Sequence, residues 1–120
     1  MTDYQMGVIE SRFANIIWEN EPISSTELAR YSEKEFAWKK STTYTVLKRL
    51  CEKGIFQNNG GVVTSRVSRQ QFYTLQSEKF VEQTFQGSLP AFLAAFTNGR
   101  PLKQEEVESL RQMVARYEEE

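Results

Sequence analysis

The spacing of apolar residues changes at one place along this chain, and that change restricts the folds it can adopt. Up to Gly54 the apolar side chains recur at helical spacing, whereas residues 55–57 and 62–67 are short β-prone runs. The sequence Asn-Asn-Gly-Gly between the two runs is a strong signal for a tight turn. From Phe72 onward the helical spacing returns. We therefore predict a two-stranded hairpin within a mainly α chain.

Residues that end or begin helices divide the segment before the hairpin into three helices. Pro22 disfavours helical geometry at the residue before it and ends the first helix. Either Ser24 or Ser25 caps the second helix. The third helix covers residues 41–53 and ends at Gly54, which suits a left-handed cap position. Three helices followed by a hairpin form the layout of a winged helix-turn-helix domain, with the hairpin as the wing.

Charge is distributed unevenly along the chain, although the net charge is only −1. Residues 1–37 sum to −4 and residues 103–120 sum to −3. Residues 38–69 carry seven basic side chains against Glu52 alone. The central third is therefore a basic block between acidic flanks, which the pI of 5.6 conceals.

Placed on a helix, residues 41–53 separate into an inner and an outer face. The inner face holds Thr43, Val46, Leu47 and Leu50. The outer face and its flanks hold hydroxyls and long cations, which reach phosphates and base edges in a major groove. We therefore interpret this segment as a recognition helix. The side chains expected to contact DNA are Lys39, Lys40, Ser41, Thr42, Tyr44, Thr45, Lys48, Arg49 and, from the hairpin, Arg66.

Two roles are expected among these side chains. Phosphates should be held by Lys39, Lys40 and Arg66, through contacts that position the protein without reading sequence. Base edges should be contacted by Ser41, Thr42, Tyr44, Thr45 and Lys48. Arg49 lies on the flank of the helix, where it either serves one of these roles or pairs with Glu52.

The remainder of the chain is helical, with more apolar surface than short helices can bury alone. Five of the eight phenylalanines lie after residue 70. This surplus predicts a partner, most simply a second copy of the chain. We predict a winged-helix DNA-binding domain over residues 1–70 and a helical dimerisation domain over residues 71–120. The side chains expected at the two-fold interface are Phe85, Leu89, Phe92, Phe96, Leu110 and Val114.

A basic, hydroxyl-rich helix face also occurs on ordinary solvated helices. The preceding helix pair, the hairpin and the basic block agree with one another and favour DNA. The competing function is a winged-helix protein-interaction module whose basic face docks an acidic protein. Steep salt dependence and preference for one duplex sequence would favour the DNA-binding function, and indifference to DNA would favour the module.

Several short motifs occur in a fixed order. The first helix ends in Ile16-Ile17-Trp18, and the recognition helix carries Trp38, Thr42, Thr45, Arg49, Leu50, Lys53 and Gly54. The segments GSLPAFLAAF and LKQEEVESLRQMV follow. Over nearly the whole chain this set resembles the BlaI/MecI/CopY family of bacterial repressors of penicillinase, methicillin-resistance and copper operons. The resemblance implies a homodimeric winged-helix repressor that binds a palindromic operator.

The chain departs from that family at several places, one of which is Ser41, where family members usually have a lysine. Lys39-Lys40 follows Trp38 where family members usually have Ser-Pro, so either Ser41 or Thr42 is expected to cap the recognition helix. The paired C-terminal cysteines of the copper-responsive branch are absent. The Asn-Phe bond cleaved in the antibiotic-responsive branch is replaced by Ala95-Phe96. Neither inducer mechanism carries over, and the sequence names no inducer and no operator.

The sequence lacks the residues that catalysis or metal binding would most commonly use. The chain has no histidine, which is the commonest general base and metal ligand. Cys51 is its single cysteine, with no second thiolate for a disulfide or a metal site. We therefore expect no enzyme activity, no cofactor and no metal. The sequence shows no signal peptide and no apolar run of about 18 residues, which favours a cytoplasmic protein without a membrane segment.

Overall fold

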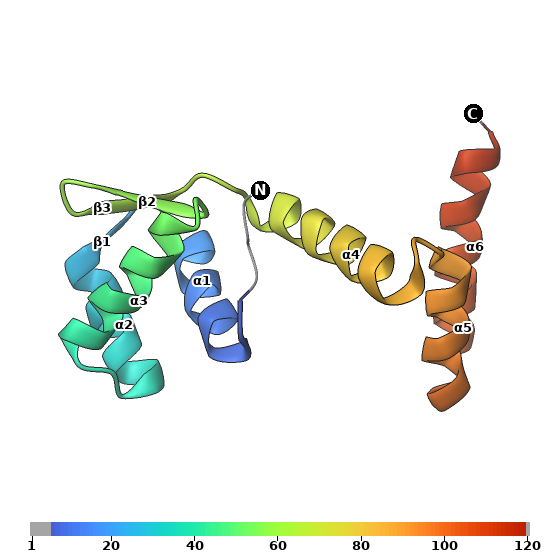
Figure 1. Cartoon of the computed structure of the whole chain (residues 1–120), viewed down its shortest axis with the longest axis horizontal. Coiled ribbons are helices and arrows are strands. Elements are labelled where there is room, and N and C mark those ends of the chain that lie inside the picture. The colour runs from blue at the N-terminus through green and yellow to red at the C-terminus, as the bar shows by residue number, and fades with distance from the viewer. Residues whose placement is uncertain (1–5, 120) are drawn as a thin grey trace. The chain divides into compact units, whose positions relative to one another are not determined.

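The computed structural model describes residues 6–119. Its elements follow the predicted order of helices, hairpin and helices (Figure 1). In chain order they are α1 (Val8–Asn20), β1 (Ile23–Ser24), α2 (Ser25–Phe36), α3 (Lys40–Glu52), β2 (Phe56–Asn59), β3 (Val62–Ser65), α4 (Arg69–Phe85), α5 (Leu89–Gly99) and α6 (Gln104–Glu118). The prediction of a mainly α chain, with a winged helix followed by further helices, is confirmed.

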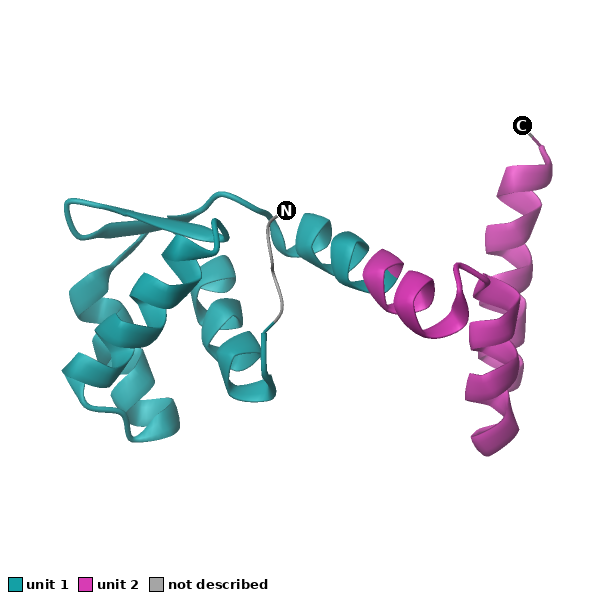
Figure 2. Cartoon of the chain, viewed as in Figure 1, with its two compact units in different colours: residues 1–77 teal, residues 78–120 magenta. Residues whose placement is uncertain are grey.

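The chain divides into two compact units between Ser77 and Glu78, inside α4 (Figure 2). The first unit contains α1 to α3, the three strands and the first part of α4. The second contains the rest of α4 with α5 and α6. The functional boundary predicted after residue 70 falls in the first turn of α4. That boundary stays a prediction, because a compact unit does not by itself assign a role.

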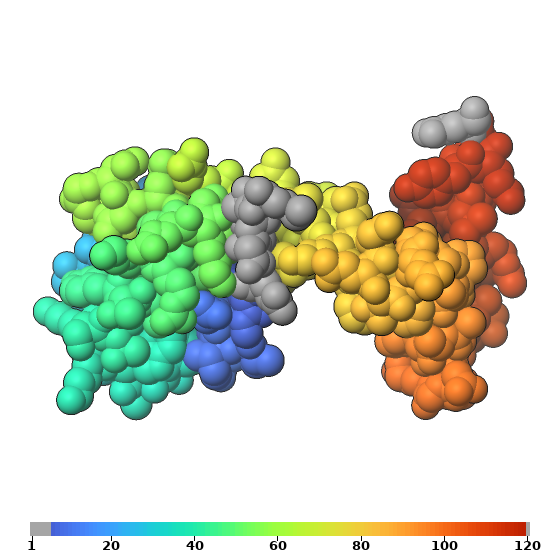
Figure 3. All heavy atoms as spheres, in the orientation of Figure 1, coloured from blue at the N-terminus to red at the C-terminus, as the bar shows by residue number. Residues whose placement is uncertain are grey.

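The first unit has an apolar core built from one face of each helix and from the sheet. Phe13 and Ile17 of α1 are fully buried, as is Leu50 of α3. Trp18 and Trp38 lie partly buried against this core. Because the inner face of α3 is packed inward, its other face lies at the surface, and the segment around α3 forms part of the face seen in Figure 3 (teal-green to green).

The wing is the predicted hairpin with a third, short strand added. β2 and β3 pair antiparallel, and the turn between them consists of Gly60 and Gly61 alone. Both glycines have positive φ, 60° and 92°, as a type I′ turn requires. β1 pairs with the other edge of β3, with Ile23 opposite Val63. Two residues are too few to show an alternating pattern, so the sequence did not reveal this strand.

The recognition helix begins earlier than expected. Its first residue is Lys40, and Lys39 occupies the N-cap position without a side-chain hydrogen bond. The prediction that Ser41 or Thr42 caps the helix is therefore wrong. Both lie within the first turn, where the N–H of Thr42 donates to the carbonyl oxygen of Lys39 at 3.0 Å. The lysine pair thus stands at the very start of α3.

The other end of α3 follows the prediction. Gly54 has a φ of 83°, in the left-handed region. Its N–H donates to the carbonyl oxygen of Cys51 at 2.9 Å, and the N–H of Ile55 donates to that of Leu50 at 3.2 Å. This pair of bonds is a Schellman motif, which satisfies the last carbonyls of α3 and turns the chain toward β2.

One buried polar group in α3 lacks a partner. Thr43 is fully buried, and its Oγ1 forms no hydrogen bond within residues 6–119. Valine keeps the shape and removes the unsatisfied hydroxyl, so Thr43→Val should raise the free energy of unfolding by about 1–2 kcal/mol. Chemical denaturation at fixed protein concentration measures this, with the exposed Thr45→Val as the control. A Thr43→Val protein less stable than the parent would mean that the hydroxyl has a partner.

The second unit has an aromatic cluster but no closed core. The ring centroid of Phe92 lies 6.0 Å from that of Phe80, 5.6 Å from Phe85 and 6.0 Å from Phe96. No residue from 78 to 119 is fully buried, and Phe80 is 50% exposed. The phenylalanine rings therefore contact one another but remain at least partly exposed to water.

Local signals position α5 and the turn that follows it. Ser88 caps α5 by accepting the N–H of Ala91 at 3.1 Å. Beyond the other end of α5, Arg100 donates to Glu106 at 2.7 and 3.3 Å. These bonds, together with the N–H of Lys103, lower the pKa of the Glu106 carboxyl to about 2. The ion pair therefore links the end of α5 to the start of α6.

Candidate nucleic-acid interface

The face of α3 opposite the core carries the side chains predicted to contact DNA. The four inner residues of α3 are buried, so the predicted separation into two faces is confirmed. Eight of the nine predicted DNA contacts lie on α3 or at its N-cap, and the ninth follows β3. All nine are exposed: Lys39, Lys40, Ser41, Thr42, Tyr44, Thr45, Lys48, Arg49 and Arg66.

Four of these side chains are cations that have no protein partner among residues 6–119. They are Lys39, Lys40, Lys48 and Arg66. Within the part of the chain that the structure describes, none of them forms an ion pair or a side-chain hydrogen bond. An unpaired cation on an exposed helix keeps all of its N–H donors for a phosphate. The positive charge at α3 is therefore available to a ligand rather than neutralised within the fold.

The hydroxyl of Thr45 is engaged inside the helix. Its Oγ1 donates to the carbonyl oxygen of Ser41, one turn earlier, at 2.8 Å. The donor is therefore used, and Thr45 offers a duplex only its oxygen lone pairs and its methyl group. Those groups suit an amino N–H at a base edge or the methyl group of a thymine.

Arg49 has a partner that the sequence did not suggest. Its Nη1 lies 3.4 Å from Oε2 of Glu10 in α1. The alternative that Arg49 pairs with Glu52 is therefore wrong. Glu52 shares a helix with Arg49, whereas Glu10 is 39 positions away along the chain, so helical spacing favours the wrong acid. The side chain of Arg49 remains 53% exposed.

The wing presents no charged side chain at its tip. Asn58 Oδ1 accepts the N–H of Gly61 at 2.9 Å and so braces the turn. The base of the wing is held by Glu21, whose carboxylate accepts the N–H and the Oγ of Ser65 at 2.8 Å each. The two glycines and the amides at this tip can therefore meet DNA only through uncharged contacts.

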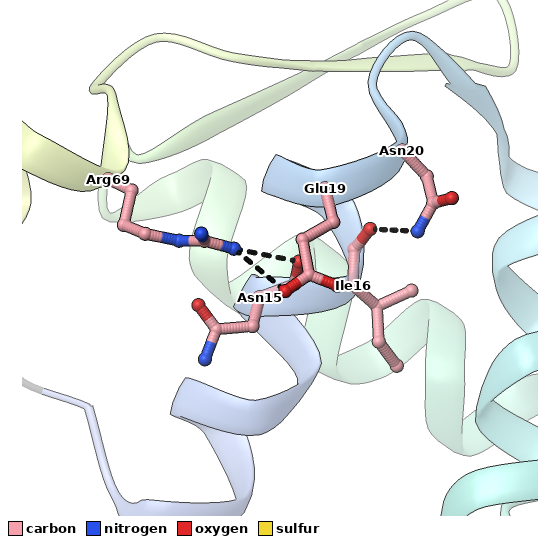
Figure 4. A network of polar contacts seen from close by, with 5 residues as sticks. All are labelled: Asn15, Ile16, Glu19, Asn20 and Arg69. Atoms are coloured by element: carbon pink, nitrogen blue, oxygen red, sulfur yellow. Dashed lines mark hydrogen bonds and ion pairs between the residues drawn. The ribbon is translucent and has the colours of Figure 1, made fainter.

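Two arginines follow the hairpin, and the structure gives them different surroundings. Arg66 is exposed, whereas Arg69 reaches back to α1 (Figure 4). Arg69 Nη2 lies 3.3 Å from Oε1 of Glu19 and 3.4 Å from the carbonyl oxygen of Asn15. Its guanidinium also lies over the ring of Trp18, 5.9 Å from the centroid. Arg69 therefore anchors the start of α4 on α1 and leaves Arg66 as the arginine open to solvent.

The side chains predicted at a two-fold interface are accessible in the second unit. Those of Leu89, Phe96 and Val114 are 56%, 42% and 56% exposed. Phe92 and Leu110 help to line an open, mainly apolar groove of about 490 Å³ beside α5 and α6. None of the six predicted residues is fully buried: Phe85, Leu89, Phe92, Phe96, Leu110 and Val114. They remain available to a partner.

The described residues also bear on a reactive thiol, a metal site and a membrane-spanning helix. Burial raises the pKa of the Cys51 thiol, and the charge of Glu52 raises it further, so the thiol stays protonated near neutral pH. Across residues 6–119, no group of three or more His, Cys, Asp or Glu side chains is placed to hold a metal ion. The same stretch contains no helix with the length and apolar character needed to cross a membrane.

Relatives of this chain match it over nearly its full length. Residues 6–116 match the family model described as penicillinase repressor. The penicillinase repressor of Bacillus licheniformis is 23% identical over 117 residues, covering 94% of this chain and 91% of that protein. The methicillin resistance regulatory protein MecI of Staphylococcus aureus (strain Mu50) is 24% identical over 115 residues, covering 92% of this chain and 94% of that protein. MecI of Mammaliicoccus sciuri is also 24% identical over 115 residues.

Proposed function

This chain belongs to the penicillinase repressor family, and from that membership we propose that it represses transcription by binding a DNA operator as a homodimer. The family is one of transcriptional repressors rather than enzymes, so no catalytic activity is assigned. The family resemblance drawn from the sequence motifs is confirmed by these matches. The operator symmetry and the dimer are our own proposals and are argued next.

The observation that carries DNA binding is the set of four cations on, or close in sequence to, α3 and the wing that have no ion-pair partner among residues 6–119. The arginines at the start of α4 and after α5 are paired with nearby acids. Lys39, Lys40 and Lys48 lie at the start or on the exposed side of α3 together with its hydroxyls, and they form no ion pair within residues 6–119. Free cations suit phosphates, and hydroxyls among them suit base edges. We propose that α3 enters the major groove.

The incomplete interior of the second unit supports the homodimer. Its helices leave large apolar side chains at the surface, including Leu89, Phe96 and Val114. Exposed apolar area of this kind marks an interaction surface, and identical chains most often cover it by two-fold symmetry. Burial against a second copy would give these helices the closed core that one chain lacks.

A two-fold dimer would present α3 twice, once to each half of a duplex site. The proposed operator is therefore an inverted repeat, with half-sites about one helical turn of DNA apart or a multiple of it. Within each half-site, Thr45 and Lys48 are proposed to contact base edges. The start of α3 and Arg66 are proposed to hold the phosphates.

The decisive test is selection from random duplexes, followed by affinity measurements at several salt concentrations. We expect an inverted repeat to emerge, with an affinity for it at least about 1,000-fold above that for unrelated DNA. Thr45→Ala and Lys48→Ala should each relax preference at one position per half-site, at a cost of about 1–3 kcal/mol. Binding that ignores DNA sequence but persists for an acidic protein would instead identify a protein-interaction module.

A further inference from the structure

Arg49 differs from the other cations predicted to meet DNA, because a carboxylate from another helix holds it. Its Nη1 lies 3.4 Å from Oε2 of Glu10. Glu10 belongs to the first turn of α1, and Arg49 to the last turns of α3. The contact therefore joins two helices that are distant in sequence, on the side of α3 that borders its exposed face.

The carboxylate of Glu10 is itself fixed in place. Its second oxygen, Oε1, accepts the N–H of Gly7 at 3.2 Å as part of the N-terminal capping arrangement of α1. The two oxygens thus have separate tasks, one at the start of α1 and one at Arg49. The side chain of Glu10 is only 21% exposed, against 53% for Arg49. The carboxylate of Glu10 is partly buried, and each of its oxygens has a polar contact. It can therefore support the more exposed guanidinium of Arg49.

Arg49 keeps most of its hydrogen-bonding capacity despite this contact. A guanidinium has about five N–H donors, and Glu10 engages a single nitrogen of Arg49 in residues 6–119. The remaining donors are free to meet a phosphate or a guanine edge. An arginine already held in one orientation loses less conformational freedom when it binds.

We propose that Glu10 is a positioning residue for DNA recognition, which holds Arg49 of α3 so that its free donors meet the operator. The proposal rests on the proposed function and adds a specific element to it. It assigns to the first turn of α1 a share of operator choice, exerted through Arg49 of α3.

If Glu10 acted only through its charge, removing the carboxylate would raise DNA affinity instead of lowering it. The direction of the change in affinity therefore distinguishes the two explanations. Removing a carboxylate near a DNA-binding face should strengthen binding to every duplex, because the anion repels phosphates. Removing a positioning group should weaken binding to the operator, because Arg49 must then be ordered at the moment of binding. The two effects are separated by comparing the selected operator with an unrelated duplex.

The test uses Glu10→Gln in the full chain. The amide oxygen can still accept the N–H of Gly7, while the charge that holds Arg49 is lost. We expect affinity for the selected operator to fall by about five- to 150-fold, the cost of ordering two long side chains, one from each α3 of the dimer. Affinity for an unrelated duplex should stay level or rise, so the ratio between the two should fall.

Glu52→Gln is the matched control, because Glu52 is an exposed acid of α3 that forms no ion pair with another residue within residues 6–119. It should raise affinity for both duplexes. In an Arg49→Ala background, Glu10→Gln should no longer lower operator affinity. Thermal unfolding of each variant separates a loss of fold from a loss of recognition.

The outcomes distinguish this inference from the function on which it rests. If Glu10→Gln strengthens binding to both duplexes, as Glu52→Gln should, or acts equally with and without Arg49, Glu10 does not position Arg49. If the parent protein selects no duplex sequence, the proposed function itself fails.

Discussion

Replacing Lys39 and Lys40 together with alanine should lower the affinity for every duplex by about a thousandfold at roughly 0.15 M salt. Both lysines stand at the start of α3, where neither has a partner in the described stretch from residue 6 to residue 119. A dimer would lose four cations, and each lost phosphate contact lowers the slope of log affinity against log salt by about 0.9. The slope should therefore fall by about 3.6, while preference among sequences is retained.

Fluorescence anisotropy across a salt series measures both quantities. The matched control replaces Lys103 and Arg116 with alanine, which removes the same charge from the second unit. The control should leave the salt slope unchanged. An equal loss of affinity in both variants would mean that overall charge, rather than contact at α3, attracts the duplex. If neither variant loses affinity, Lys39 and Lys40 do not contact DNA.

Val114→Asp should convert the protein to monomers at micromolar concentration. Val114 is 56% exposed in the single chain, so aspartate there costs one chain little. In the proposed dimer the same position is covered, and two unpaired carboxylates would be buried at several kcal/mol each. We expect the dimer to weaken by about a thousandfold or more, and operator binding to be lost with it.

Light scattering measures the mass, which should change from twice 14.0 kDa to 14.0 kDa. Gln112→Asp is the control, because it adds the same charge about 200° away around α6. Fluorescence of Trp18 and Trp38 reports separately whether the first unit stays folded. A Val114→Asp protein that remains dimeric would place the interface elsewhere.

Signals confined to a few neighbouring residues were predicted well. Gly54 ends α3 with positive φ, and two glycines turn the wing. Each depends on backbone geometry that its own residue type dictates. The inner face of α3 was equally clear, because burial at helical spacing follows directly from the order of apolar residues.

Features that depend on distant contacts were missed or left open. Arg66 and Arg69 are alike in sequence, yet only the folded chain brings Glu19 beside Arg69. The pairing of Arg49 with Glu10 has the same origin. The start of α3 was misjudged for a local reason, because hydroxyls at Ser41 and Thr42 were expected to cap a helix that begins without a side-chain cap.

The lack of a closed core in residues 78–119 has a consequence for the concentration at which the protein must be present in the cell. Because the proposed second copy covers these helices, their folding depends on protein concentration by mass action. Below the dimer dissociation constant, the step that empties the operator also exposes apolar helices to proteases. In the proposed dimer, derepression and turnover would therefore coincide, because a chain too dilute to bind its operator would also leave these helices uncovered.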